Sequence, residues 1–173
     1  LGQLDIDTLK LHIYPDARLP AEWQAELGER NRPRVGLFVS NKSPQRRWSW
    51  EKWQQLALKL SDQADIVILY DPIAPPSEQQ LASLHGRSLL TPSVDEFVAA
   101  ASQLDVVISA DSAPVHISSA LQIPVVALFE SRPEKYRRWY PLTRHVLLHA
   151  GPQVDDITVD AVEAAARSLL ITD

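Results

Sequence analysis

The chain has 173 residues, of which 22 are acidic and 17 basic, so its formal net charge is −5, and it contains neither cysteine nor methionine. This length favours one domain with a sizeable core, and the acidic balance argues against a general nucleic-acid surface, which depends on massed Lys and Arg. The absence of cysteine excludes disulfides, a thiol nucleophile and a cysteine metal site, and it fits a cytoplasmic location.

Neither a membrane span nor an export signal is visible in the sequence. The longest apolar runs are well short of the roughly 18 to 20 residues that cross a bilayer, and the first ten residues lack a basic region followed by an apolar one. Because the chain begins at Leu1 and has no Met, we expect it to be a piece of a longer or processed polypeptide.

From residue 34 onward, strand-like apolar runs alternate with helical patterns, which is typical of βα units and a largely parallel sheet. Residues 1–33 fit this alternation poorly, so we interpret them as a leading segment or interdomain linker, with a possible strand at 9–14 and a short helix at 21–27. The domain itself is then residues 34–173. Its predicted strands lie at 34–39, 65–70, 105–110 and 124–129, with weaker ones at 87–90 and 145–149.

Capping signals and apolar stripes predict the helices between these strands. The first helix has an apolar stripe at helical spacing, formed by Trp53, Leu56, Ala57 and Leu60, and Ser49 is its predicted N-cap. Two further helix starts have the spacing of a capping box, and a last helix carries an apolar stripe after a threonine. The residues concerned are Ser77 with Gln80, Ser93 with Glu96, and Thr158 before Val162, Ala165, Ala166 and Leu169. The class is therefore α/β, with helices on both faces of the sheet.

Ligands of parallel sheets bind beyond the carboxyl ends of the strands, where loops lead into helix N-termini. The loop "NKSPQRRWSW" after the first strand brings Lys42, Arg46 and Arg47 within six positions. A solvated basic turn is one interpretation, but the place of the loop ahead of a helix favours an anion site.

A second loop, "ADSAP", follows the strand at 105–110. Pro114 suits the first turn of a helix, and Asp111 or Ser112 suits its cap, so the open N–H groups and the helix dipole predict an anion site. A nucleophile elbow would need small glycines around the serine, and none is present. His116 falls in the helix beyond, either as a satisfied or as a ligand-facing imidazole, and one His with one Asp is too few for a metal.

The third loop, "FESRPEKYRRWYP", follows the strand at 124–129. Its charged residues fit a surface loop and a contact with a substrate or partner equally well. They are Glu130, Arg132, Lys135, Arg137 and Arg138.

The order of these loops resembles glycosyltransferase family 9, the heptosyltransferases of bacterial lipopolysaccharide core assembly, and specifically their C-terminal donor-binding domain. The segment "DVVISADSAPVHISSALQIPVVALF" is similar to the strand, Asp-Thr/Ser-Gly, His, helix, Pro and strand of the family. "VGLFVSNKSPQRRWSWEKWQQLALKL" resembles its strand, basic loop with Lys/Arg-Arg-Trp, and helix. "ILYDPIAPPSEQQLASL" stands where the family has a strand, a glycine-containing loop and an acidic residue that opens a helix. The resemblance covers roughly residues 34–142.

This resemblance implies the GT-B architecture, two Rossmann-like domains across a cleft, of which this chain matches the second. It implies ADP-heptose as donor and inverting transfer to a lipopolysaccharide core sugar, without a cofactor or an essential metal. The acidic general base would then belong to an N-terminal domain outside this chain. It also implies a cytoplasmic protein, with peripheral association at the inner face of the inner membrane.

The resemblance assigns roles to residues of all three segments. Asp111, Ser112 and the backbone at Ala113 and Pro114 would hold the diphosphate, with His116 close by. Arg46 and its neighbours Lys42 and Arg47 would neutralise the diphosphate, and Glu78 would meet the ribose. No catalytic residue is expected within the chain itself.

The sequence departs from the family pattern at two positions. Ala113 replaces the glycine that follows Asp-Ser, and Glu130 stands where the family has the glycine of Phe-Gly-Pro, which places a carboxylate near an anionic donor. Two alternatives therefore stay open. One is a catalytically degenerate GT-B domain that acts as a binding module, and the other is a different sugar-nucleotide GT-B enzyme such as an epimerase.

Overall fold

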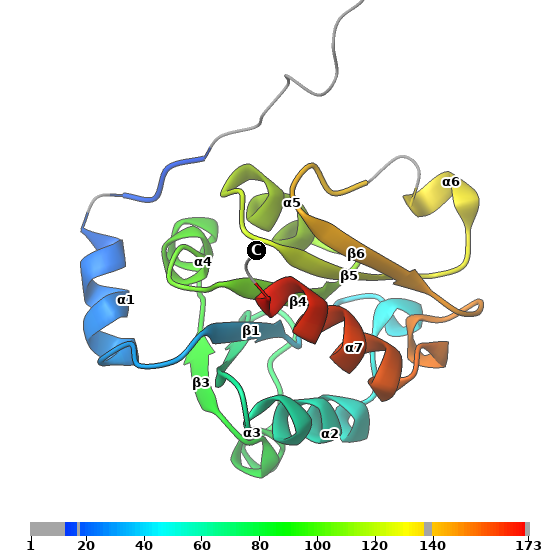
Figure 1. Ribbon diagram of the computed structural model, residues 1–173, viewed down its shortest axis with the longest axis horizontal. Coiled ribbons are helices and arrows are strands. Elements are labelled where there is room, and N and C mark those ends of the chain that lie inside the picture. Colours follow the sequence, from blue (N-terminus) through cyan, green and yellow to red (C-terminus); the bar gives the residue numbers. More distant parts are fainter. Residues whose placement is uncertain (1–12, 17, 137–139, 172–173) are drawn as a thin grey trace, which may run out of the picture.

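The computed structural model describes residues 13–16, 18–136 and 140–171. Six strands form one parallel sheet in the order β3-β2-β1-β4-β5-β6 (Figure 1). All six strands predicted from the sequence are confirmed, with ends that differ by a residue at most. Their bounds are β1 Arg34–Phe38, β2 Asp65–Tyr70, β3 Arg87–Leu90, β4 Val106–Ala110, β5 Val125–Phe129 and β6 His145–His149.

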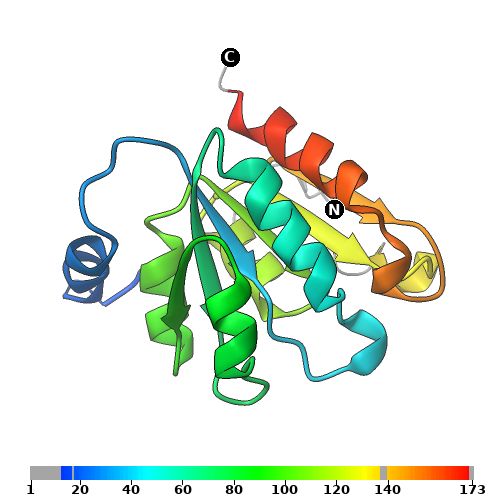
Figure 2. The same ribbon diagram turned by 90° about the horizontal axis from the view of Figure 1, so that it is seen from below.

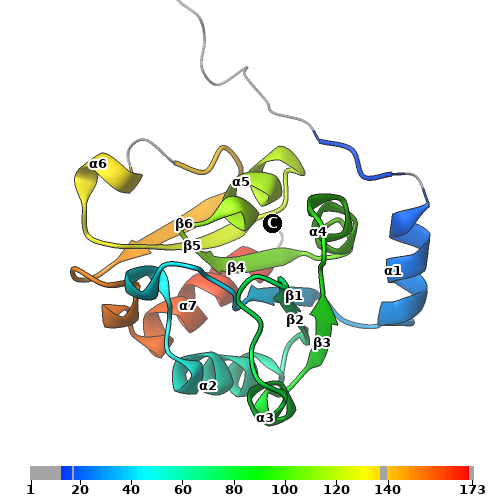
Figure 3. The same cartoon turned by 180° about the vertical axis from the view of Figure 1, so that it is seen from behind.

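Helices cover both faces of the sheet, as predicted. They are α1 Leu19–Leu27, α2 Trp50–Leu60, α3 Glu78–Ser83, α4 Val94–Ala101, α5 Ala113–Ala120, α6 Pro133–Tyr136 and α7 Val159–Leu170, with 3-10 turns η2 Pro44–Arg46 and η3 Val154–Asp156. Figures 1 and 3 place α4 and α5 on one side of the sheet and α2, α3 and α7 on the other. Figure 2 shows α2 and α7 side by side.

The sheet is buried on both faces, which explains the near-continuous apolar runs in the strands. Leu37 belongs to the apolar cluster beneath α2 and α7, whereas its neighbour Phe38 packs on the opposite face, edge-on against Phe97 of α4 with ring centroids 5.3 Å apart. Gly36 of β1 permits a close approach, because a Cβ there would come within 2.4 Å of Leu104 Cδ1.

The leading segment is only partly within the described residues. The strand predicted at 9–14 falls mostly outside them, and Ile13 and Tyr14, which are described, are not in a strand. The helix predicted at 21–27 is present as α1, and it packs on the domain through Trp23, whose Nε1 donates to Glu96 Oε2 at 2.7 Å. The boundary between residues 33 and 34 remains a prediction.

The helix caps agree with the sequence in full at Ser77 and Thr158 and in part at Ser93 and Ser49. Ser77 and Gln80 form a complete capping box, and Thr158 accepts from the Ala161 N–H. At Ser93 half of the predicted box is present, because Ser93 accepts from the Glu96 N–H, while the Glu96 carboxylate accepts from Trp23 Nε1. Ser49 holds the N-cap position of α2, but its side chain makes no capping bond.

The start of α2 is instead tied to the segment that opens α7. The N–H of Ser49 donates to Asp155 Oδ1 at 2.7 Å, and Trp48 Nε1 donates to the carbonyl of Ile157 at 2.9 Å. Trp48 also packs edge-on against Trp53, with centroids 4.8 Å apart. The β1–α2 loop is therefore anchored by residues more than one hundred positions further along the chain.

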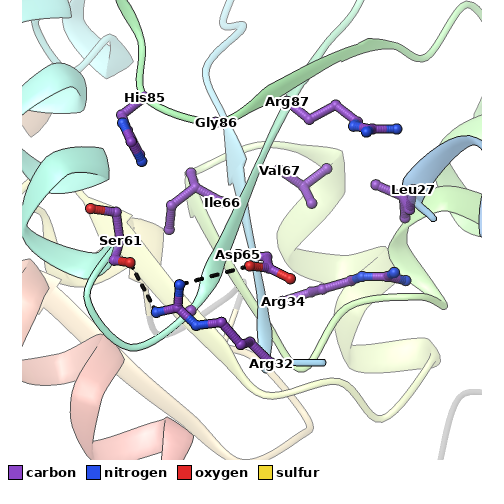
Figure 4. Close-up of a pocket in the computed structure, with 11 residues that line it drawn as sticks. Leu27, Arg32, Arg34, Ser61, Asp65, Ile66, Val67, His85, Gly86 and Arg87 are labelled. Atoms are coloured by element: carbon purple, nitrogen blue, oxygen red, sulfur yellow. Dashed lines mark hydrogen bonds and ion pairs between the residues drawn. The ribbon is translucent and has the colours of Figure 1, made fainter. Parts of the chain in front are cut away.

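Three arginines gather at the amino ends of β1, β2 and β3, around a pocket of about 290 Å³ (Figure 4). Arg32 donates to the carbonyl of Ser61 at 2.9 Å, at the end of α2, and lies 3.9 Å from Asp65. The buried Arg34 donates to the Gly28 carbonyl at 2.7 Å, and Arg87 donates to another carbonyl at the end of α1. Cations at helix C-termini complement the helix dipole, so these arginines lock α1 and α2 onto the sheet.

Candidate functional site

The largest pocket described here, about 610 Å³, opens at the carboxyl ends of β1 and β4. These strands are neighbours, but the chain runs outward from β1 through β2 and β3 before it crosses to β4, so the pocket lies at the switch point of the sheet. Ligands of doubly wound sheets bind at such a point. Pockets of this size hold small molecules and cofactors. The residues that line it are Phe38, Ser40, Asn41, Lys42, Ser43, Arg46, Asp71, Pro72, Ile73, Thr91, Pro92, Ser93, Val94, Phe97, Asp111, Ser112, Ala113, Pro114 and Ile117.

One end of the pocket combines cations with the start of α5. Lys42 and Arg46 come from the β1–α2 loop, and Ser112 is the N-cap residue of α5. The hydroxyl of Ser112 donates to the Ala110 carbonyl at 2.9 Å and makes no capping bond to its own helix. The Ser112 side chain therefore does not cap α5, and the positive end of the helix dipole faces the same space as the two cations.

The backbone of this helix start is unstrained. Pro114 lies in the first turn of α5, as the sequence predicts, and Ala113 is the first helical residue. Among the described residues, Gln122 is the only non-glycine with a positive φ, so Ala113 has an ordinary negative φ. The alanine thus occupies the family's glycine position without any backbone penalty.

Arg46 is flanked by two carboxylates without a close hydrogen bond to either. Its Nη1 lies 3.5 Å from Asp111 Oδ2, and its Nε lies 3.6 Å from Glu130 Oε1. Both distances exceed the 2.7–2.9 Å of a charge-assisted hydrogen bond. The buried Nε of Arg46 has no hydrogen-bond partner. The charge of Arg46 is compensated, whereas part of its donor capacity is unused.

The other end of the pocket is apolar. Phe38, Phe97 and Ile117 form its floor, and Ile73 and Val94 stand at its rim with 63% and 60% of their surface exposed. The loop that carries Ile73 is held by the Asp71 carboxylate, which accepts from the N–H groups of Ile73 and Ala74 at 2.9 and 3.0 Å. An apolar slot beside an anion site suits a ligand with a flat ring at one end and phosphate at the other.

Three residues predicted for the site do not line this pocket. Arg47 points to the neighbouring side of its loop, where its Nε donates to the Asn41 carbonyl at 2.8 Å. Glu78 is exposed on the first turn of α3. His116 is half-buried on α5 and is not among the residues that line the pocket, whereas the next residue, Ile117, is.

The pocket also contains residues that sequence reasoning missed. The loops after β2 and β3 supply Asp71–Ile73 and Thr91–Val94. The sequence did contain a signal for these two loops, because each follows the carboxyl end of a predicted parallel strand, where ligands bind. They were not singled out because they lack the basic residues of the other loops. In the third loop, Glu130 is buried behind Arg46, while Arg137 and Arg138 lie outside the described residues.

A doubly wound parallel sheet with a ligand-sized pocket at its switch point defines a Rossmann-type α/β domain. The model of glycosyltransferase family 9 (heptosyltransferase) matches residues 6–163. The chain therefore belongs to glycosyltransferase family 9. Among curated proteins, none matches the sequence significantly.

Solved structures place the fold with the same family. The chain is similar to the family 9 glycosyl transferase from Veillonella parvula DSM 2008, with a TM-score of 0.77 and 17% identity over 92% of this chain and 53% of that one. ADP-heptose LPS heptosyltransferase II from E. coli gives 0.70 and 20% over 92% and 53%, and E. coli heptosyltransferase WaaC with ADP gives 0.65 and 16% over 87% and 48%. The chain thus spans about half the length of the structures it matches.

Within residues 13–16, 18–136 and 140–171, no helix is long and apolar enough to cross a membrane. The same residues contain no group of three or more His, Asp or Glu side chains that could hold a metal ion.

Proposed function

We propose that this chain is the donor-binding half of a heptosyltransferase-like glycosyltransferase. The observation that carries the proposal is the pocket at the switch point. One end of it contains Lys42, Arg46 and the start of α5, and the other end is apolar. A nucleoside diphosphate sugar has the matching parts, a base for the slot and a diphosphate for the cations. Family membership favours ADP-heptose as the donor and the lipopolysaccharide core as the acceptor.

The chemistry of sugar transfer requires that the diphosphate leaving group be bound and its charge stabilised. An acceptor hydroxyl attacks the anomeric carbon while the nucleoside diphosphate leaves, so negative charge grows on the phosphate oxygens. Preorganised donors and cations stabilise that charge, and removal of one such donor typically costs about 10²- to 10³-fold in rate. Arg46 and the start of α5 would bind the leaving group, whereas the general base and the residues that bind the acceptor would come from another domain. In this proposal the enzyme works without a metal cofactor at the cytoplasmic face of the inner membrane.

A binding experiment with a matched pair of variants tests the site. The chain is expected to bind ADP and ADP-heptose in calorimetry. Val94→Asp should weaken binding several-fold, because it places a negative charge at the rim of the pocket, yet at the first position of α4 it suits the helix dipole. Leu58→Asp is the control, because Leu58 is 65% exposed on α2, away from the pocket, and the same change there should leave the affinity unaltered. Equal losses in both variants, or no binding by the unmodified chain, would contradict the proposal.

A transfer assay separates binding from catalysis. These 173 residues alone should bind ADP-heptose but transfer no heptose to a truncated core acceptor, because no base is expected among them. Product formation by this chain alone would overturn the assignment as a donor half.

A second candidate is a binding module without transferase activity. It is favoured by one observation, the placement of Glu130 and Asp111 around the cation that would neutralise the donor. ADP binding without heptose transfer, in a polypeptide that also carries an N-terminal domain, would support this candidate instead.

A further inference from the structure

Glu130 is a buried carboxylate directly behind the anion end of the pocket. It follows β5, and only 5% of its surface is exposed. Its Oε1 lies 3.6 Å from Arg46 Nε, and its Oε2 lies 3.0 Å from Arg132 Nε. The Oε2–Arg132 contact lacks hydrogen-bond geometry, so the buried Oε2 is without a hydrogen-bond partner. A desolvated carboxylate that is held by charge rather than by hydrogen bonds acts strongly on its neighbours.

Glu130 does not touch the pocket, so it would act on a bound ligand through its charge, across Arg46, and not by direct contact. Arg46 lines the pocket and Glu130 does not, so the guanidinium stands between the carboxylate and any bound anion. The cluster contains two cations, Arg46 and Arg132, and two carboxylates, Asp111 and Glu130. The charge of Arg46 is therefore already balanced before a ligand binds. A ligand phosphate must compete with Asp111 and Glu130 for the Arg46 guanidinium.

The charge of the ligand then decides how strongly Glu130 opposes binding. Both phosphates of a nucleotide sugar are diesters with one negative charge each. After transfer, the terminal phosphate of the nucleoside diphosphate is a monoester, which carries about −1.5 to −2 near pH 7. The product thus brings up to one more negative charge to this end of the pocket than the donor does.

We propose that Glu130 is a specificity-determining residue that disfavours the free nucleoside diphosphate more than the nucleotide sugar. The inference rests on the proposed function, since it requires a diphosphate in this pocket. Glu130 weakens retention of the leaving group after transfer and so limits inhibition by the product. If Glu130 served only to position Arg46, its loss would weaken both ligands.

Calorimetry with ADP and ADP-heptose tests the inference, in buffer with EDTA so that no divalent cation masks the charge of ADP. Glu130→Gln keeps the shape of the side chain and removes its charge. Removal of one negative charge close to a bound phosphate changes affinity by about three- to thirtyfold. In Glu130→Gln we therefore expect ADP to bind about tenfold more tightly and ADP-heptose about threefold more tightly than in the unmodified chain. Glu134→Gln removes the same charge from an exposed residue of α6, and it should change neither affinity.

A second variant acts in the opposite direction and guards against a folding failure of the first. Arg132→Gln removes the half-exposed cation that partly neutralises Glu130, so ADP should bind more weakly and lose more affinity than ADP-heptose. Weaker ADP binding in Glu130→Gln, or an unchanged ratio of the two dissociation constants in both variants, would overturn the inference while leaving the proposed function intact. Failure of the unmodified chain to bind either ligand would overturn the proposed function, and the inference with it.

Discussion

Replacement of Ala113 by glycine tests whether the anion site is functional as it stands. Ala113 is the first residue of α5, lines the pocket and has a negative φ. The change to glycine relieves no backbone strain, because none exists there. Ala113→Gly is therefore expected to change ADP affinity by less than about threefold, since only a methyl group is lost from a wide pocket.

The same change has a defined effect on stability. An alanine-to-glycine change in a helix costs up to about 1 kcal/mol, through the greater backbone entropy of the unfolded chain. For a domain of this size, that corresponds to a fall in Tm of about 2–4 °C. Ala120→Gly at the other end of α5 is the matched control, because it carries a similar backbone cost but does not line the pocket.

Thermal melts and ADP titrations of both variants give the result. Similar small falls in Tm with nearly unchanged affinity are expected. A gain of tenfold or more in ADP affinity for Ala113→Gly alone would refute the reasoning, because it would mean that the methyl group blocks the phosphate and that the site has decayed.

Three further predictions concern charge and packing. Arg46→Ala should weaken ADP binding about 10- to 100-fold and reduce its salt dependence, whereas Arg47→Ala should have a much smaller effect, and calorimetry at two salt concentrations distinguishes them. Burial raises the pKa of Asp155, but the N–H of Ser49 and the ammonium of Lys52 outweigh it and hold that pKa below the ordinary 3.8. Asp155→Asn should therefore cost a few tenths to about 1 kcal/mol at pH 7, as for a partly exposed pair, and the difference in urea unfolding should disappear as the pH falls through the lowered pKa. Trp53→Ala should lower the free energy of unfolding by about 3–5 kcal/mol, and a loss under 1 kcal/mol would contradict its place in the core.

The fold could be predicted from the sequence because each strand repeats a strong local signal. β1, β2, β4 and β5 are fully or nearly fully buried, so each appears as a near-continuous apolar run. The caps at Ser77 and Ser93 were predictable for the same reason, since their partners lie three residues away. Ser49 is the N-cap residue of α2, as predicted, but the Asp155 carboxylate that accepts from its N–H is 106 positions away, and local spacing does not reveal that contact.

The candidate site was only partly predictable. The spacing of residues places Lys42 and Arg46 in one loop and Asp111 in another, and the parallel topology brings both loops to one edge. Spacing cannot tell which arginine of the pair Arg46 and Arg47 faces the pocket, because that depends on the turn η2 between them and the strand. The pairing of Arg46 with Glu130 likewise depends on the neighbouring positions of β1, β4 and β5, which sequence distance does not encode.

The anchoring of the β1–α2 loop by η3 and α7 has a consequence for the order of folding. The loop carries Lys42 and Arg46, yet its fixed points at Asp155 and Ile157 are more than one hundred residues later in the chain. Contacts of such long sequence separation form late, because the loop closure they require is entropically costly. During synthesis all six strands leave the ribosome before η3 and α7 do, so the sheet can assemble while the anion end of the pocket still lacks its support. We expect the ability to bind a diphosphate to be acquired last, as a single late event that follows formation of the sheet.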